Sequence, residues 1–164
     1  MFPDDIQTQA AAVVAAAALA QGVMLATAES CTGGLVAAAL TAIAGSSGAL
    51  DRGFVTYSNE AKTGMLGVPA ELIVTQGAVS EQVARAMAIG AVSHSRAGLA
   101  VSITGIAGPG GGSDEKPVGL VHFAVADARG VHHEVHRFGD IGREAVRLAS
   151  VRIALSLLLG RLQP

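Results

Sequence analysis

The chain has 164 residues, of which 51% are hydrophobic and 21 are glycine, and its formal net charge is −2. This length and composition predict one domain over residues 1–164 with a substantial hydrophobic core. The small net charge and the few aromatic residues, four Phe, one Tyr and no Trp, exclude the basic, aromatic-rich surface that is typical of nucleic-acid binding.

The first predicted element is an alanine-rich helix from Asp4 to Gln21, with an aspartate near its start and Gly22 at its end. Its apolar run, Ala10 to Ala20, is too short to cross a bilayer and follows acidic residues, whereas a secretion signal needs basic ones. We therefore expect no membrane partner. A lone cysteine, Cys31, excludes an internal disulfide and fits a reducing compartment, so we expect a cytoplasmic protein.

Strands and helices alternate along the rest of the chain. The predicted strands are Met24–Ala28, Gly53–Tyr57, Leu99–Thr104, Leu120–Asp127 and Val131–Phe138. The further predicted helices are Gly34–Ile43, Asn59–Leu66, Ala70–Gln76, one capped by Ser80 that runs to Ser95, and Asp140–Leu159, which Gly160 stops. The first three strands should run parallel, and the last two should form a hairpin through Ala128-Arg129-Gly130. This order predicts an α/β fold with a mixed, mostly parallel five-stranded sheet and helices on both faces.

Ligands bind such sheets at the carboxyl ends of the strands, so the loops Glu29–Gly34, Tyr57–Lys62 and Thr104–Gly112 should converge. The first loop places Ser30 between a strand and a helix, where a nucleophile is exposed and a helix N-terminus stabilises negative charge. The alternative for this loop is a polar helix cap with glycines for tight packing.

The second and third loops also have two interpretations each. Asn59 is a candidate helix cap, and Lys62, one of only two lysines, is a candidate reactive amine or else a solvated surface charge. The glycine-rich stretch after Thr104 lacks the Gly-Lys-Ser/Thr of a Walker A loop. Its glycines would let backbone N–H groups approach a phosphate or carbonyl oxygen, or they form a flexible connection.

Metal binding is not predicted from the five histidines, His94, His122, His132, His133 and His136. A three-residue hairpin connection would place His122 opposite His136, with Glu134 as the one further ligand on the hairpin. We therefore expect surface histidines.

Several strings, in a fixed order over residues 5–160, resemble the CinA carboxyl-terminal domain family: ATAESCTGG, AGSS, GFVTYSNEAK, GAVSE, SITGIAGPGGGSDEKPVG and the REAVR at the start of the last helix. The resemblance implies a three-layer α/β/α sandwich and a cytoplasmic amidohydrolase of pyridine nucleotide salvage. The implied reaction converts nicotinamide mononucleotide and water to nicotinic acid mononucleotide and ammonia, without metal or organic cofactor. Family members are also described in connection with competence or DNA damage.

The resemblance also implies roles for single residues. Ser30 would be the nucleophile, Lys62 the general base and Tyr57 a proton relay or positioning group. The implied substrate-binding residues are Thr32, Gly33, Gly34, Ser46, Ser47, Asn59, Thr104, Gly105, Ala107, Gly108, Gly111, Gly112 and Arg143, of which Arg143 would hold the phosphate.

A lysine base must be neutral, so its pKa must lie below the usual value of ~10.4. We hypothesise that Lys62 lies against apolar residues and close to Arg143 or a helix N-terminus, and that Glu29 orients the turn. Cys31 is a rival nucleophile. A non-catalytic nucleotide-binding sensor is the rival of another class, and exposed Ala and Val faces predict a homo-oligomer.

Overall fold

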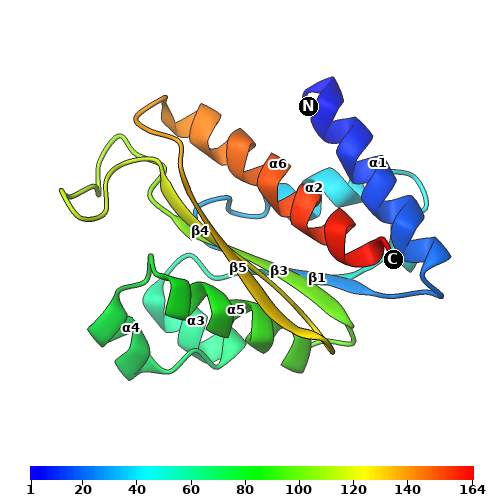
Figure 1. The fold of residues 1–164 in the computed structure, drawn as a ribbon, viewed down its shortest axis with the longest axis horizontal. Coiled ribbons are helices and arrows are strands. Elements are labelled where there is room, and N and C mark those ends of the chain that lie inside the picture. Colours follow the sequence, from blue (N-terminus) through cyan, green and yellow to red (C-terminus); the bar gives the residue numbers. More distant parts are fainter.

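A mixed five-stranded sheet in the order β2-β1-β3-β4-β5 forms the centre of the computed structural model, which describes residues 1–164 (Figure 1). The strands are β1 (Leu25–Glu29), β2 (Leu50–Val55), β3 (Leu99–Gly105), β4 (Leu120–Asp127) and β5 (Gly130–Arg137). β1 pairs in parallel with β2 and β3, whereas β4 is antiparallel to both β3 and β5. The predicted mixed sheet, with three parallel strands and a hairpin, is confirmed.

Helices cover both faces of this sheet, as Figure 1 shows. One face carries α1 (Asp4–Leu19), α2 (Leu35–Thr41) and α6 (Arg143–Leu162), and the other carries α3 (Asn59–Leu66), α4 (Ala70–Gln76) and α5 (Glu81–Ser93). A 3-10 turn, η1 (Ser46–Gly48), precedes β2. The arrangement is the expected three-layer α/β/α sandwich.

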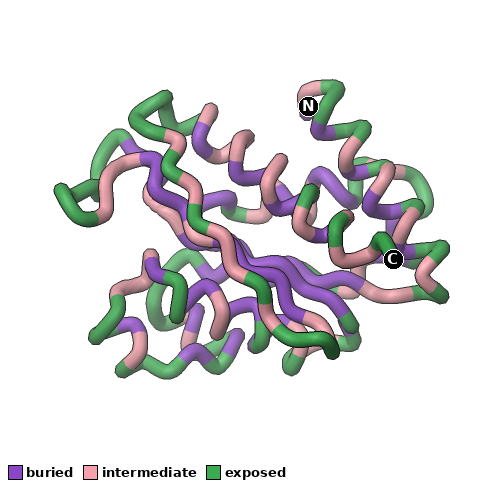
Figure 2. The backbone as a smooth tube through the Cα atoms, in the orientation of Figure 1, coloured by how far each residue is buried: buried purple, intermediate pink, exposed green.

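The core has two unequal halves. The larger cluster holds 24 buried residues between the sheet and α1, α2 and α6. The cluster on the other face holds 11, among them the strand alanines Ala26, Ala28 and Ala100, whose short side chains let α5 lie close to the sheet. Figure 2 shows the central strands fully buried, whereas β5 alternates at the edge. The predicted apolar run at Leu99–Thr104 is indeed the middle strand.

The last helix differs from its prediction at both ends. It begins at Arg143 instead of Asp140, and it continues through Gly160 to Leu162. Gly160 therefore does not stop the helix, since a single glycine costs a helix only about 1 kcal/mol and tertiary packing overrides it. At the amino terminus, Pro3 precedes α1 and no side chain caps it, so the aspartates lie in the first turn instead of at the cap.

β2 starts at Leu50, three residues before the predicted start at Gly53. Parallel pairing explains the difference, because Leu50 lies opposite Leu25 at the beginning of β1. Glycine usually weakens a strand, yet at position 53 the absence of a side chain lets β2 pack closely against Thr27 and Ala37. A Cβ at this position would lie 2.9 Å from the Thr27 hydroxyl and 3.1 Å from the Ala37 Cβ.

The predicted three-residue hairpin connection is wrong by one residue. Gly130 already pairs with Asp127, so only two residues form the turn, and the Asp127 carboxylate accepts the Arg129 N–H at 2.8 Å. A shift of one residue moves every side chain to the other face. His122 therefore lies opposite Val135 and not opposite His136.

Two further expectations concern surfaces. None of the helices combines the length and the apolar character that crossing a membrane requires. The structure contains one chain, in which β2 and β5 are both edge strands, so the expected self-association stays a prediction.

Gly90 is expected to be essential where α5 meets α3. A Cβ at Gly90 would collide with the backbone oxygen of Leu66, so Gly90→Ala must push the two helices apart. We expect this change to lower the free energy of unfolding by about 1–3 kcal/mol. The control is Gly160→Ala in α6, where a Cβ meets nothing within 4 Å, and it should raise that free energy by about 0.5–1 kcal/mol. Urea denaturation measures both, and a Gly90→Ala variant as stable as the wild type would contradict the contact.

Candidate active site

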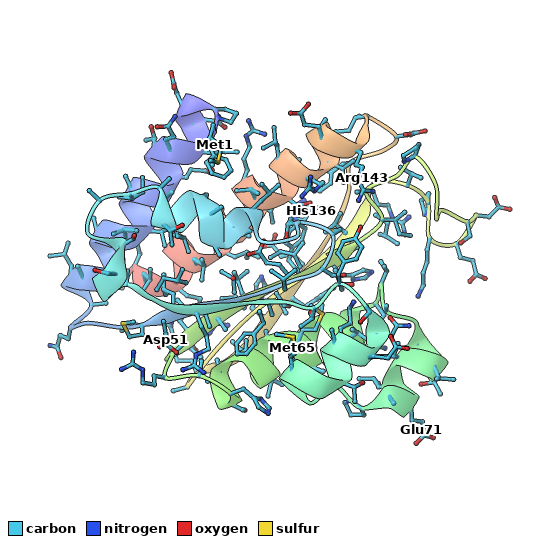
Figure 3. All side chains as sticks on the ribbon, turned by 180° about the vertical axis from the view of Figure 1, so that it is seen from behind. Met1, Asp51, Met65, Glu71, His136 and Arg143 are labelled. Atoms are coloured by element: carbon cyan, nitrogen blue, oxygen red, sulfur yellow. The ribbon has the colours of Figure 1, made fainter.

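A pocket of about 280 Å³ opens at the carboxyl ends of the parallel strands, where the three predicted loops converge. The residues that line it belong to the turn after β1, the segment after β2, the connection between α4 and α5, the glycine-rich loop after β3 and the first turn of α6. Figure 3 labels Arg143 at that first turn, beside the glycine-rich loop.

Ser30 directly follows β1 and is almost buried, with 9% of its surface exposed at the pocket wall. Its N–H donates to the Ile103 carbonyl of β3 at 2.9 Å, which continues the sheet by one residue. Its carbonyl accepts the Gly33 N–H at 3.0 Å and closes a turn. The hydroxyl is thus attached to a backbone that is fixed on both sides.

Glu29 holds the same turn from inside the protein. Its buried carboxylate accepts the Thr32 hydroxyl at 2.7 Å, the Val36 N–H at 2.9 Å and the Ala37 N–H at 3.0 Å. These bonds satisfy the free N–H groups at the start of α2, where negative charge is also favoured. The hypothesis that Glu29 orients the turn is confirmed.

Lys62, on α3, is 1% exposed and is the largest fully buried side chain of the protein. Its Nζ donates to the Ser30 Oγ at 3.1 Å and to the Thr56 carbonyl oxygen at 3.0 Å. Burial lowers the pKa of the Lys62 ammonium, because leaving water disfavours the charged form. The expected surface-charge alternative for Lys62 is therefore wrong.

The hypothesis that a neighbouring cation also lowers this pKa needs correction, since desolvation by burial alone lowers it. Arg143 is engaged elsewhere: its Nη1 donates to the Gly108 carbonyl at 2.8 Å and its Nη2 to the Tyr57 hydroxyl at 2.9 Å. Tyr57 is 61% exposed at the mouth of the pocket. Arg143 thus joins the second and third loops across the site.

The cap of α3 is another correction. Ser58, and not Asn59, caps this helix, because the Ser58 hydroxyl accepts the Ala61 N–H at 3.0 Å. The Asn59 side chain is therefore not the helix cap, and Asn59 lines the pocket.

The glycine-rich loop brings backbone groups close to the pocket. A Cβ at Gly105 would lie 2.7 Å from the Val121 side chain, so only glycine fits there. Thr104 is not free, since its hydroxyl donates to the Ala78 carbonyl at 2.8 Å. The N–H groups of Ala107 and Gly108 donate to no protein acceptor, which leaves them for a ligand.

Six arginines form ion pairs with carboxylates within 4 Å. The other five basic side chains have no such partner: Lys62, Lys116, Arg137, Arg143 and Arg147. Of these, Lys62 and Arg143 line the pocket, and the guanidinium of Arg143 suits an anionic ligand.

Most of the expected site residues line this pocket: Ser30, Tyr57, Asn59, Lys62, Thr104, Gly105, Ala107, Gly108, Gly111 and Arg143. Six do not. Thr32, Gly33 and Gly34 form the turn behind Ser30 and the start of α2, and Gly112 lines a neighbouring open cavity. Ser46 and Ser47 lie in η1 near the amino end of β1, where the Leu25 N–H donates to Ala49. Figure 3 shows Asp51, early in β2, far from Arg143.

Sequence reasoning assigned no role to three lining residues, Ala78, Val79 and Ile106, or to the neighbouring Arg147. Cys31, considered only as a rival nucleophile, and Gly110 of the glycine-rich loop also line the pocket. Ala78 and Val79 belong to the GAVSE string, whose position before a predicted helix was the available signal. Arg147 shares the REAVR string with Arg143, one helical turn later.

The histidines of the hairpin make two separate groups of contacts, one group on each face of the hairpin. His122 Nδ1 lies 2.8 Å from His133 Nε2, whereas Glu134 contacts His132 and His136. Burial and the neighbouring His133 lower the pKa of His122 to about 4. No group of three or more His, Cys, Asp or Glu side chains in the chain is arranged to hold a metal ion.

Known proteins resemble this chain in sequence and in fold. The CinA C-terminal domain family matches residues 7–162. Nicotinamide-nucleotide amidohydrolase PncC of Escherichia coli (strain K12) is 55% identical over 139 residues, which cover 85% of this chain and 84% of that protein. A CinA-like protein of Geobacter sulfurreducens is 51% identical over 142 residues, which cover 87% of this chain and 34% of that protein. The crystal structure of the competence/damage inducible protein CihA from Agrobacterium tumefaciens has a TM-score of 0.97 and 57% identity, covering 99% of both chains.

Cys31 is expected to be unreactive in the folded protein. It is 6% exposed, and burial raises the pKa of its thiol to about 11, so the thiolate is scarce at neutral pH. A disulfide reagent such as DTNB at pH 8 should therefore react much more slowly with the native protein than with protein unfolded in guanidinium chloride. Equal rates in the two states would restore Cys31 as a rival nucleophile.

Proposed function

Because the chain belongs to the CinA C-terminal domain family, we propose that it is an amidohydrolase that converts nicotinamide mononucleotide and water to nicotinic acid mononucleotide and ammonia. The single observation that carries this proposal is the buried contact of 3.1 Å between the Lys62 amine and the Ser30 hydroxyl. The E. coli relative, named as an amidohydrolase of this nucleotide, supports the choice of substrate.

The proposed reaction starts with the transfer of the Ser30 hydroxyl proton to the neutral Lys62 amine. The Ser30 oxygen bonds to the carboxamide carbon and gives a tetrahedral intermediate. Lys62 then returns the proton to the amide nitrogen, the carbon–nitrogen bond breaks and ammonia leaves. Tyr57, held by Arg143 at the pocket mouth, would position the amide or relay this proton.

Deacylation repeats these steps with water in place of the serine hydroxyl. Lys62 accepts a proton from the water, the water oxygen bonds to the acyl carbon, and the bond to the Ser30 oxygen breaks. The proton on Lys62 returns to Ser30, which restores the enzyme and leaves the carboxylic acid product, and this acid releases its proton to water or to ammonia.

The negative charge on the carbonyl oxygen requires donors near Ser30. The Cys31 N–H donates to no protein acceptor, and Cys31 lines the pocket directly after Ser30. A well-placed backbone donor of this kind stabilises the transition state by roughly 3–4 kcal/mol. We assign this group to the oxyanion.

The phosphate of the nucleotide would bind at the opposite side of the pocket. Arg143 has no carboxylate partner, and the free N–H groups of Ala107 and Gly108 lie on the loop that Arg143 touches. A guanidinium with adjacent backbone donors matches the geometry of a phosphate group.

A non-catalytic nucleotide sensor explains the glycine-rich loop and the unpaired arginines, but it has no use for a buried lysine. Burying an amine that has no counter-charge costs stability. The enzyme is therefore favoured over the sensor.

We further propose that residues 1–164 act as one amidase domain. The loops after β1, β2 and β3 form the pocket together with residues of α3, of α6 and of the connection that precedes α5, and these helices pack on the same sheet. The buried free thiol of Cys31 fits a reducing compartment, which supports a cytoplasmic location.

Ser30→Ala should abolish ammonia release from nicotinamide mononucleotide while leaving the fold intact.

Lys62→Met should lower kcat by about 10²–10⁴-fold, the usual effect of losing a general base, with a small change in KM. A buried Met side chain has no polar group that loses its hydration. Lys62→Met should therefore be at least as stable as the wild type in urea. Near-normal turnover by Ser30→Ala, or an effect of Lys62→Met on KM alone, would contradict these roles.

Arg143→Ala should weaken substrates that carry a phosphate. We expect kcat/KM for nicotinamide mononucleotide to fall by on the order of 100-fold, as for a lost charge-assisted contact of about 3 kcal/mol. Hydrolysis of the dephosphorylated riboside should change far less. Arg152→Ala is the control, since Arg152 contacts Asp5 on α1 and lies outside the pocket. Equal losses on both substrates would assign Arg143 another role.

A further inference from the structure

Arg147 lies one helical turn after Arg143 on α6 but does not line the pocket. Its guanidinium is half-buried and forms no ion pair with a carboxylate. Instead, its Nε donates to the Cys31 carbonyl at 3.1 Å and its Nη2 to the Thr32 carbonyl at 3.2 Å. One side chain thus holds two successive carbonyl groups of the turn that follows Ser30.

These contacts fix the direction of N–H groups as well. In a trans peptide the C=O and N–H groups of one plane point in opposite directions. The Cys31 carbonyl faces Arg147, so the Thr32 N–H is turned away from α6. Neither this N–H nor that of Cys31 has an acceptor in the protein, but Thr32 is fully buried, so only the Cys31 N–H borders the pocket.

Arg147 is the only donor to the Cys31 carbonyl oxygen. The Thr32 carbonyl has a second donor, the Leu35 N–H at 3.0 Å, and Glu29 holds the turn through the Thr32 hydroxyl and the start of α2. The peptide plane between Cys31 and Thr32 is therefore the part of the turn that depends on Arg147. Gly33 lies beside the guanidinium, where a Cβ would be in ordinary contact with Nη2 at 3.4 Å.

We propose that Arg147 is a positioning residue of the amidase reaction. It holds the Cys31–Thr32 peptide, and with it the turn that places the Ser30 hydroxyl and the Cys31 N–H at the pocket wall, in position for the scissile amide. Its positive charge beside the turn stabilises the negative charge that develops on the oxygen of that amide. The inference rests on the proposed function, because it presumes that Ser30 attacks an acyl group.

The test compares Arg147→Gln and Arg147→Lys with the control Arg152→Gln, which changes an arginine of the same helix that contacts Asp5 and not the turn. Circular dichroism identifies a temperature at which all variants are folded. For ammonia release, Arg147→Gln should lower kcat by on the order of 100-fold, as expected for a misplaced reacting group, with KM changed less than about threefold. Arg147→Lys keeps the charge and one donor, so its kcat should be intermediate, and Arg152→Gln should match the wild type.

A second readout does not depend on the natural substrate. A fluorophosphonate reacts with an activated serine: the Ser30 oxygen bonds to phosphorus, fluoride leaves, and Lys62 takes the serine proton. The phosphoryl oxygen then occupies the position of the oxyanion, so Arg147→Gln should slow this labelling by a factor similar to that on kcat.

The results of these experiments distinguish the proposed amidohydrolase function from the proposed role of Arg147. A wild type that is labelled at Ser30 but releases no ammonia from nicotinamide mononucleotide contradicts the proposed substrate, while slower labelling of Arg147→Gln still supports the inference. Unchanged kcat and labelling rate in Arg147→Gln, or a change in KM alone, overturn the role of Arg147. A wild type that does neither reaction overturns both.

Discussion

The contact between the buried Lys62 amine and the Ser30 hydroxyl is the interaction on which the rest of the site depends. Inside the protein, Nζ has two neutral acceptors, the Ser30 oxygen and the Thr56 carbonyl, and no carboxylate. A charged ammonium is costly in such surroundings, so the fold favours the neutral amine that can accept a proton. In the proposed mechanism this burial makes the lysine a base, and it also lowers the stability of the protein, which is a common compromise at active sites.

The sheet topology brings these two groups together. β1 and β2 are parallel neighbours, with Glu29 opposite Val55, so the residues that follow the two strands leave the sheet side by side. Ser30 ends one strand, and α3 begins shortly after the other and carries Lys62 beneath the turn. From the opposite face, α6 supplies two arginines one turn apart: Arg143 closes the pocket mouth, and Arg147 holds the turn behind Ser30.

Much of this arrangement was predictable from the sequence. The strand order along the chain and the rule that ligands bind at the carboxyl ends of parallel strands placed the three loops together. The loops alone left the roles of Ser30 and Lys62 open, and the resemblance to the CinA carboxyl-terminal domain family singled these two residues out. What failed depends on contacts distant in sequence. Gly160 resembles a helix stop, but packing of α6 carries the helix past it. Ser46 and Ser47 lie within a matching motif, yet η1 leads from α2 to the amino end of β2 and not to the carboxyl ends of the strands. The hairpin register was missed by one residue because a two-residue and a three-residue turn fit the same letters.

The state of Lys62 can be measured directly. The protein has only two lysines, so Lys116→Arg leaves Lys62 as the sole lysine. With isotopically labelled lysine, the NMR shifts of its Cε and Nζ atoms report the pKa as the pH is raised. Burial beside Ser30 predicts a titration clearly below the ordinary value of 10.5 in the folded protein and a return to that value in denaturant. A folded-state pKa at or above 10.5 would show an ammonium that cannot act as the base.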